Sequence, residues 1–169
     1  MDRCSIPELN FGTKYRIVCI RNDDAVWIEN VPNLVVNTGL EYAMGRIFGT
    51  LDQKSMYMGL CTDTTVSPTD TAETHSFVEF MGTVNAYRPV AEFSDSGLAP
   101  GFDNRYTYTA PSVQVMIGSG DTLKGVFLTT EELKGSDTGT LYGVAPFSVD
   151  RVVVPGDALL TTITVSAQG

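Results

Sequence analysis

The fold is decided by a stretch that reads N-L-V-V-N-T-G-L-E-Y-A-M-G-R-I-F-G at residues 33–49 and Y-M-G-L-C-T-D-T-T-V-S-P-T-D-T-A-E at residues 57–73. Its first part predicts a short strand that runs directly into a helix. Its second part predicts a buried strand over residues 55–62, because this run is largely apolar. A long loop rich in Thr, Ser, Asp and Pro follows over residues 63–73. No part of the stretch has a catalytic pattern.

The helix near residues 38–48 is the only convincing helix in the sequence. Leu40, Met44 and Ile47 share one face at i, i+4 and i+7 spacing. A helix this short and apolar is marginal alone in water, so we expect it to close one end of a β core.

Both ends of this helix carry recognisable signals. Asn37 or Thr38 is expected to cap its N-terminus, with Glu41 placed as the capping-box partner of Thr38. Gly49 is expected to end the helix, because glycine readily adopts the left-handed backbone conformation of a C′ residue.

The rest of the chain predicts short strands separated by turns. The expected strands are residues 15–20, 25–29, 77–81, 90–93, 105–109, 112–117, 122–129, 140–144, 148–154 and 159–165. In the last of them, Leu159, Thr161, Ile163 and Val165 alternate on one face. Strands at this spacing are typical of a sandwich or barrel.

The length of 169 residues favours one domain. We therefore expect an all-β protein: a single jelly-roll-like β-sandwich of about nine or ten short strands over residues 13–169. Residues 1–12 are expected to form an N-terminal arm, because Pro7, Asn10 and Gly12 interrupt any regular pattern.

The composition excludes several classes of function. The net charge is −9 at pH 7 and the 11 Lys and Arg residues are scattered singly, so no basic footprint for nucleic acid exists. No apolar run reaches the length of a membrane span, and the N-terminus has no signal-peptide core. Only 18% of the residues are charged, so Ser and Thr must supply much of the polar surface, which favours an interaction protein.

Residues for catalysis are scarce, and we expect no enzymatic activity. The chain has a single histidine, His75, and its nearest candidate nucleophile, Cys61, lies in an apolar strand where a thiol is inert. Glu79 and Glu92 are the only carboxylates in an apolar setting, and we expect both to point outward from strands.

We expect no cofactor and no metal. The three cysteines, Cys4, Cys19 and Cys61, do not form a disulfide framework, and Cys19 and Cys61 read as buried apolar residues. The acidic loops at residues 63–73 and 94–103 offer oxygen atoms for Ca²⁺ as an alternative, but they lack the EF-hand order.

Six motifs resemble a module found in many tailed-bacteriophage virion proteins. They are N-L-V-V-N-T-G-L (33–40), Y-M-G-L-C-T (57–62), V-S-P-T-D-T-A-E (66–73), Y-R-P-V (87–90), G-V-F-L-T (125–129) and V-P-G-D-A-L-L-T (154–161). Together they span most of residues 30–167. The chain departs from the module at Cys61, where the module usually has glycine, and in the larger distance between Arg88 and the preceding loop.

The resemblance implies a non-enzymatic virion component, made in the host cytoplasm and commonly oligomeric, here a dimer or trimer. The chain has no coiled-coil stem, collagen-like repeat or receptor-tip domain, which favours a capsid decoration (cement) protein bound to the major capsid protein. A tail, baseplate or fibre component bound to other virion proteins is the alternative. A carbohydrate-binding sandwich is another, because Trp27, Tyr87, Tyr106 and Tyr108 could form a sugar platform, although they also suit cross-strand pairs.

Three segments are the expected contacts with a partner. The arm would anchor through its apolar side chains, and the two polar loops would supply the remaining contacts. The candidate residues are Ile6, Leu9 and Phe11 in the arm, Thr64, Thr65, Val66 and Pro68 in the first loop, and Leu98 and Phe102 in the second. Each loop could equally be exposed without any contact.

Overall fold

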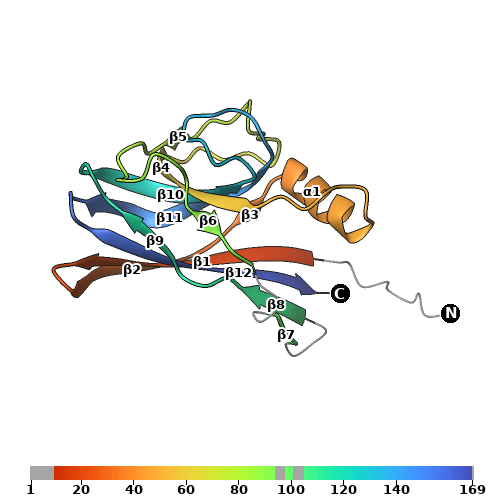
Figure 1. Cartoon of the computed structure of the whole chain (residues 1–169), viewed down its shortest axis with the longest axis horizontal. Helices are drawn as coiled ribbons and strands as arrows, with labels where there is room; N and C mark the ends of the chain where they lie inside the picture. The colour runs from red at the N-terminus through yellow and green to blue at the C-terminus, as the bar shows by residue number, and fades with distance from the viewer. Residues whose placement is uncertain (1–9, 94–97, 101–104, 169) are drawn as a thin grey trace.

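In the part of the chain that the structure describes, two antiparallel sheets of six strands each form the body, and one helix lies at one end (Figure 1). The computed structural model describes residues 10–93, 98–100 and 105–168. Within these residues the chain has twelve strands, whereas the expected total was about nine or ten. The prediction of an all-β sandwich with one short helix is confirmed.

The first sheet has the strand order β2-β1-β12-β8-β7, with β9 paired to the other half of β12. Its strands are β1 (Asn10–Arg21), β2 (Asp24–Pro32), β7 (Leu98–Pro100), β8 (Arg105–Thr109), β9 (Val113–Met116) and β12 (Ala158–Gln168). Strands β1 and β2 form a hairpin, whose turn places Asn22 and Asp23 at positive φ. Because β1 begins at Asn10, residues 10–12 lie in the sheet and not in an arm.

The second sheet has the order β3-β11-β10-β4-β5, with β6 also paired to β4. Its strands are β3 (Leu34–Val35), β4 (Met56–Asp63), β5 (Val78–Glu79), β6 (Val90–Ala91), β10 (Asp121–Thr129) and β11 (Leu141–Val153). The two strands expected over residues 140–154 are one strand. Pro146 cannot donate to the ladder, but β11 continues past it through a register shift opposite Leu123 and Gly125.

The main core lies between the sheets. It includes Tyr15, Ile17 and Cys19 from β1, Leu159 and Ile163 from β12, Met58 and Leu60 from β4, and Val126 and Leu128 from β10. A second, smaller cluster lies on the outer face of the second sheet and includes Val36, Cys61, Phe77, Phe127, Leu141 and Val144. Strands β4 and β10 are therefore covered on both faces, which explains their continuous apolar sequences. Cys19 and Cys61 are buried free thiols, as predicted.

Helix α1 (Asn37–Ile47) is present where the sequence predicts it, but its N-terminus is capped differently. Val36 occupies the N-cap position, and no side chain caps the helix. The Thr38 hydroxyl instead donates to the Leu141 carbonyl at 2.8 Å, so the capping-box prediction is wrong. Gly49 has a φ of 69° directly after the C-cap residue, and that prediction is confirmed.

The face that α1 turns to the body also differs from the prediction. Gly39 is the buried residue of the helix, and Tyr42 and Ala43 pack against the main core. The apolar face expected from the sequence, Leu40, Met44 and Ile47, is exposed. Because Gly39 has no side chain, α1 packs directly on the backbone of β11. A Cβ atom at this position would lie 2.0 Å from the Tyr142 carbonyl oxygen.

We expect Gly39→Ala to lower the free energy of unfolding by roughly 1–3 kcal/mol, because the added methyl group must push α1 away from the backbone of β11. Urea denaturation followed by circular dichroism measures the change. Glu41→Ala, on the exposed side of the same helix, is the control and should stay within about 0.5 kcal/mol of the wild type. Equal stability of the two variants would contradict the close seating of α1.

The turn between β11 and β12 is held by a buried carboxylate. Asp157 accepts hydrogen bonds from Arg21 Nε at 2.7 Å and Nη2 at 2.8 Å, and from the Val154 N–H at 2.9 Å. The Arg21 hydrogen bonds hold the pKa of the Asp157 carboxyl below its ordinary value of 3.8. The ionised carboxylate therefore ties the β1–β2 hairpin to the last turn of the chain.

This pKa predicts an acid-dependent contribution to stability. A carboxyl whose pKa is lower in the folded state stabilises it fully above the unfolded pKa and loses that contribution as the pH falls through the folded pKa. We expect Asp157→Asn to be less stable than the wild type at pH 7 and the difference to shrink below about pH 4. Denaturation from pH 7 to pH 2 measures it, with the exposed Asp150→Asn as control. A difference that is constant with pH would contradict the assignment.

Candidate interaction surface

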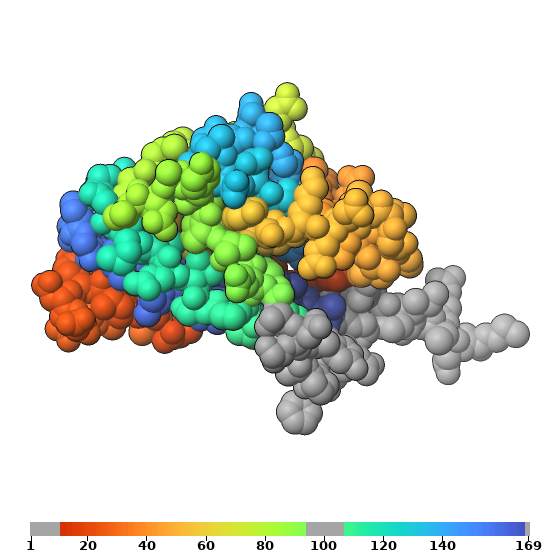
Figure 2. Space-filling model, viewed as in Figure 1, coloured from red at the N-terminus to blue at the C-terminus, as the bar shows by residue number. Residues whose placement is uncertain are grey.

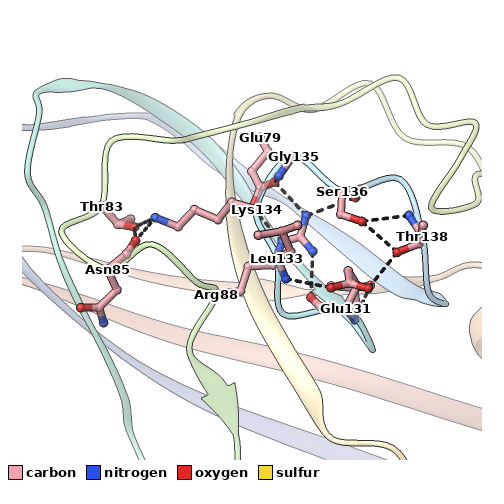
Figure 3. A network of polar contacts seen from close by, with 11 residues as sticks. Glu79, Thr83, Asn85, Arg88, Glu131, Leu133, Lys134, Gly135, Ser136 and Thr138 are labelled. Atoms are coloured by element: carbon pink, nitrogen blue, oxygen red, sulfur yellow. Dashed lines mark hydrogen bonds and ion pairs between the residues drawn. The ribbon is translucent and has the colours of Figure 1, made fainter.

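A buried ion pair joins two segments on the outer face of the second sheet (Figure 3). Arg88 donates from Nε and Nη2 to the two carboxylate oxygens of Glu79, each at 2.8 Å. The side chains of Arg88 and Glu79 are only 4% and 9% exposed. Glu79 therefore points away from the main core, as expected, but it is covered, because the chain returns past β5 nine residues later and places Arg88 against it.

Arg88 also holds the loop of residues 130–140. Its Nη1 donates to the Glu131 carbonyl at 2.8 Å, and the N–H of Gly135 donates to Glu79 Oε2 at 2.6 Å. The guanidinium carbon lies 5.1 Å from the centre of the Phe127 ring. The hydrogen-bonding groups of Arg88 and Glu79 therefore all have partners. The ion pair acts as a rigid support beneath the loop and not as a reactive group.

Further hydrogen bonds connect this loop to residues 83–85. The Lys134 ammonium donates to the Thr83 hydroxyl and to the Asn85 carbonyl. Within the loop, Glu131 accepts hydrogen bonds from the Leu133 N–H at 2.9 Å and the Thr138 hydroxyl at 2.8 Å. These bonds, the one from Leu133 first, lower the pKa of the Glu131 carboxyl. Two segments far apart in sequence are thus joined into one surface (Figure 3).

Exposed apolar side chains occur on β5, on the segment that follows it and in the loop that Arg88 holds. Five of them are each more than half exposed: Val78, Met81, Val84, Tyr87 and Leu133. Tyr87 and Leu133 form a backbone bridge, so the two segments contribute neighbouring side chains. We call these five residues the loop platform. Exposed apolar side chains on segments that are held in place from beneath are suited to a protein–protein contact.

A pocket of about 420 Å³ adjoins the platform. Its lining includes Phe77, Phe127, Leu141, Met81 and His75, together with the buried ion pair. His75 Nδ1 lies 3.0 Å from the Phe77 carbonyl, which can only accept, so Nδ1 carries the hydrogen. The imidazole also stacks on the Phe77 ring, with 3.9 Å between ring centres. These contacts give His75 a structural role.

The possible Cys61–His75 dyad gains no support from this geometry. Burial raises the pKa of the Cys61 thiol well above its ordinary value, which keeps the sulfur protonated and unreactive. In the part of the chain that the structure describes, no three His, Cys, Asp or Glu side chains converge to hold a metal ion. In the loop considered for Ca²⁺, the Asp70 carboxylate accepts a hydrogen bond from the Ser67 N–H at 2.9 Å, within the same loop.

The structure distributes the predicted contact residues over several places. The loop after β4 folds back onto the sheet: Val66 packs against the second cluster, and the Pro68 carbonyl accepts from the Asn37 N–H at 2.8 Å. Thr64 is half-buried, whereas Thr65 and the Pro68 side chain are exposed. This loop covers the second sheet, and only part of it is free to contact a partner.

The other predicted residues lie on the first sheet or outside the described residues. Phe11 is half-buried in β1 opposite Ala167. Leu98 belongs to the edge strand β7, so residues 98–100 are a strand and not the expected loop. Ile6, Leu9 and Phe102 lie outside the described residues, as does Cys4.

The aromatic residues considered for sugar binding each contact a different neighbour. Trp27 packs against Phe147, with 6.2 Å between ring centres, and Tyr108 packs against Phe93 at 5.4 Å. Tyr87 lies in the loop platform beside Leu133. These three rings therefore do not combine into one flat platform.

The loop platform was not found from the sequence. The sequence shows Arg88 only as part of the Y-R-P-V motif, and it does not indicate that Glu79 is its partner. One signal was present, because a glutamate within the apolar run at residues 77–81 requires a cationic partner if that run is buried.

The comparisons with known proteins leave the family open. None of the described helices is long and apolar enough to cross a membrane. No protein-family model matches the chain, and neither a curated protein nor a solved structure matches it.

Proposed function

We propose that this chain is a non-enzymatic structural protein of a virion, and specifically a capsid decoration (cement) protein that binds the lattice of the major capsid protein. Two lines of argument support the proposal. The six motifs over residues 33–161 resemble the virion module described above. The single structural observation that carries it is the loop platform, an exposed apolar surface on a rigid base.

The platform suits a permanent contact. Arg88 and Glu79 hold both contributing segments before any partner binds, so little conformational entropy is lost on association. Ser136 and Thr138 beside it provide hydroxyl groups for a polar rim. A cement protein needs such a preorganised surface, because it must add stability to a lattice that is already assembled.

A tail, baseplate or fibre component is the second candidate, since the same motifs occur in both kinds of virion protein. The open edges of the two sheets at β2 and β5 would serve either role. The carbohydrate-binding alternative is not favoured, because Trp27 and Tyr108 pack against other aromatic residues.

The test is binding to capsids that lack this protein. We expect the double variant Met81→Glu/Val84→Glu to bind at least ~30-fold more weakly than the wild type, because two carboxylates would be forced against an apolar contact. Cosedimentation with purified capsids measures the affinity. Val149→Glu changes a similarly exposed residue on β11 and should bind as the wild type does.

Two results would contradict this proposal. Equal affinity of the platform variant and the wild type would remove the platform from the contact. Failure of the wild type to bind any capsid preparation, together with binding to isolated tails, would favour the tail alternative.

A further inference from the structure

We propose that the outward face of α1 is a contact through which two copies of this chain associate. The inference does not depend on the proposed function, since it concerns the chain alone. The face consists of Leu40, Met44, Ile47, Phe48 and Leu51, which we call the helix stripe. All five are exposed, and Ile47 and Phe48 are 57% and 71% exposed.

The stripe is unusual because α1 is apolar on two sides. Gly39, Tyr42 and Ala43 already fill the side that faces the core. A helix at the surface of a monomer normally turns polar residues outward, and one that is apolar all round is normally buried. In the space-filling view α1 stands out at the end of the sandwich (Figure 2).

The turn after α1 extends the stripe. The chain reverses at Gly49, and the N–H of Leu51 donates to the Gly45 carbonyl at 3.3 Å. The Leu51 side chain lies against Gly45, where a Cβ atom would come within 2.5 Å of it. The turn therefore places the Leu51 side chain against α1, where it adds to the exposed apolar surface of the helix.

The charges beside the stripe suit a second copy of this chain. Two copies with a net charge of −9 each repel one another unless their contact is locally balanced. The residues at and after α1 carry two anions, Glu41 and Asp52, and two cations, Arg46 and Lys54. Arg46 donates to the Leu51 carbonyl at 2.7 Å, so its guanidinium lies at the turn after α1.

Other exposed apolar surfaces lack this balance. The loop platform is bordered by Glu131, Glu132 and Asp137, while the ammonium of Lys134 is bound within the network. The valines of β11 lie beside Asp150. Self-association through either surface would bring like charges together, which opposes binding. Of these three surfaces, the helix stripe is the one with balanced charges on its own segment, which suits self-association.

The area and the spacing also fit a twofold contact. The five side chains expose on the order of 500 Å² per copy, more than half of the ~800 Å² that each partner buries in a standard interface. In an antiparallel pair of helices with Met44 at the twofold axis, Leu40 of one copy lies opposite Phe48 of the second copy, since each is four residues from the axis.

Analytical ultracentrifugation of the full chain at about 1–100 μM tests the association. The wild type is expected to form dimers, and Phe48→Glu is expected to raise the dissociation constant at least ~30-fold. The control Val149→Glu should dimerise as the wild type does. A wild type that is monomeric throughout this range, or a Phe48→Glu variant that dimerises normally, would overturn the proposal.

A crosslink tests the twofold geometry with a variant whose fold is undisturbed. Met44→Cys in a Cys4→Ser background should form a covalent dimer under mild oxidation, because the axis passes close to residue 44. Cys19 and Cys61 are buried and do not compete. Val149→Cys in the same background is the control. Equal crosslinking of the two variants, or none at residue 44, would overturn the arrangement.

Discussion

Replacement of Arg88 by methionine is expected to lower the free energy of unfolding by about 3–5 kcal/mol. The change leaves the Glu79 carboxylate buried without its cation and removes the donor that holds the Glu131 carbonyl. An unpaired buried charge is more costly than the loss of an exposed ion pair, because water cannot replace the missing partner. Equilibrium denaturation in urea measures the difference.

Two further variants separate this explanation from a general effect of losing an arginine. Arg16→Met removes an exposed arginine of β1 and should change the stability by less than about 0.5 kcal/mol. The double variant Glu79→Met/Arg88→Met removes both charges and should recover much of the lost stability. A single Arg88→Met variant as stable as Arg16→Met would show that the pair is not the support of the loop platform.

Phe127→Ala is expected to be comparably destabilising, by about 3–5 kcal/mol. Phe127 is buried on the outer face of β10, where its ring centre lies 4.8 Å from that of Phe77 and 5.1 Å from the Arg88 guanidinium carbon. The ring also fills the space above Gly59 in the neighbouring strand. Removing it opens a cavity beneath both the ion pair and the loop that follows β4.

Thermal and urea denaturation measure this change, and Tyr87→Ala is the matched control. Tyr87 is an aromatic residue of the loop platform that is more than half exposed, so its truncation should cost less than about 1 kcal/mol. A small effect at Phe127, equal to that at Tyr87, would mean that the second cluster does not support the loops above it.

Local patterns predicted the strands and the position of the helix. The alternation of Leu159, Thr161 and Ile163 places these three side chains in the core, as expected, because the side-chain direction in a strand depends only on the parity of the residue number. Gly49 ends α1 for an equally local reason, since its positive φ favours glycine.

Long-range contacts account for what the sequence could not show. The helix is apolar on two sides, and its long-range contacts, above all the tight seating of Gly39 on Tyr142, decide which side faces the core. The partner of Glu79 could not be identified, because the path of residues 80–87 that returns Arg88 to β5 has no periodic pattern. The exposure of the loop platform follows from that same path.

The two proposed surfaces serve different partners. The loop platform belongs to β5, the segment that follows it and the loop of residues 130–140, whereas helix α1 lies at the end of the sandwich (Figure 1). A dimer formed through α1 would present two loop platforms. Two platforms on one dimer would bind a repeating lattice more tightly than a single platform, because the second contact becomes intramolecular.

Cryo-electron microscopy of purified particles from the source tests the central claim most directly, since it shows where this chain sits. The proposed function predicts density for the β-sandwich on the outer face of the capsid, with the loop platform against the major capsid protein. Absence of this chain from both capsid and tail in purified particles would contradict a virion role.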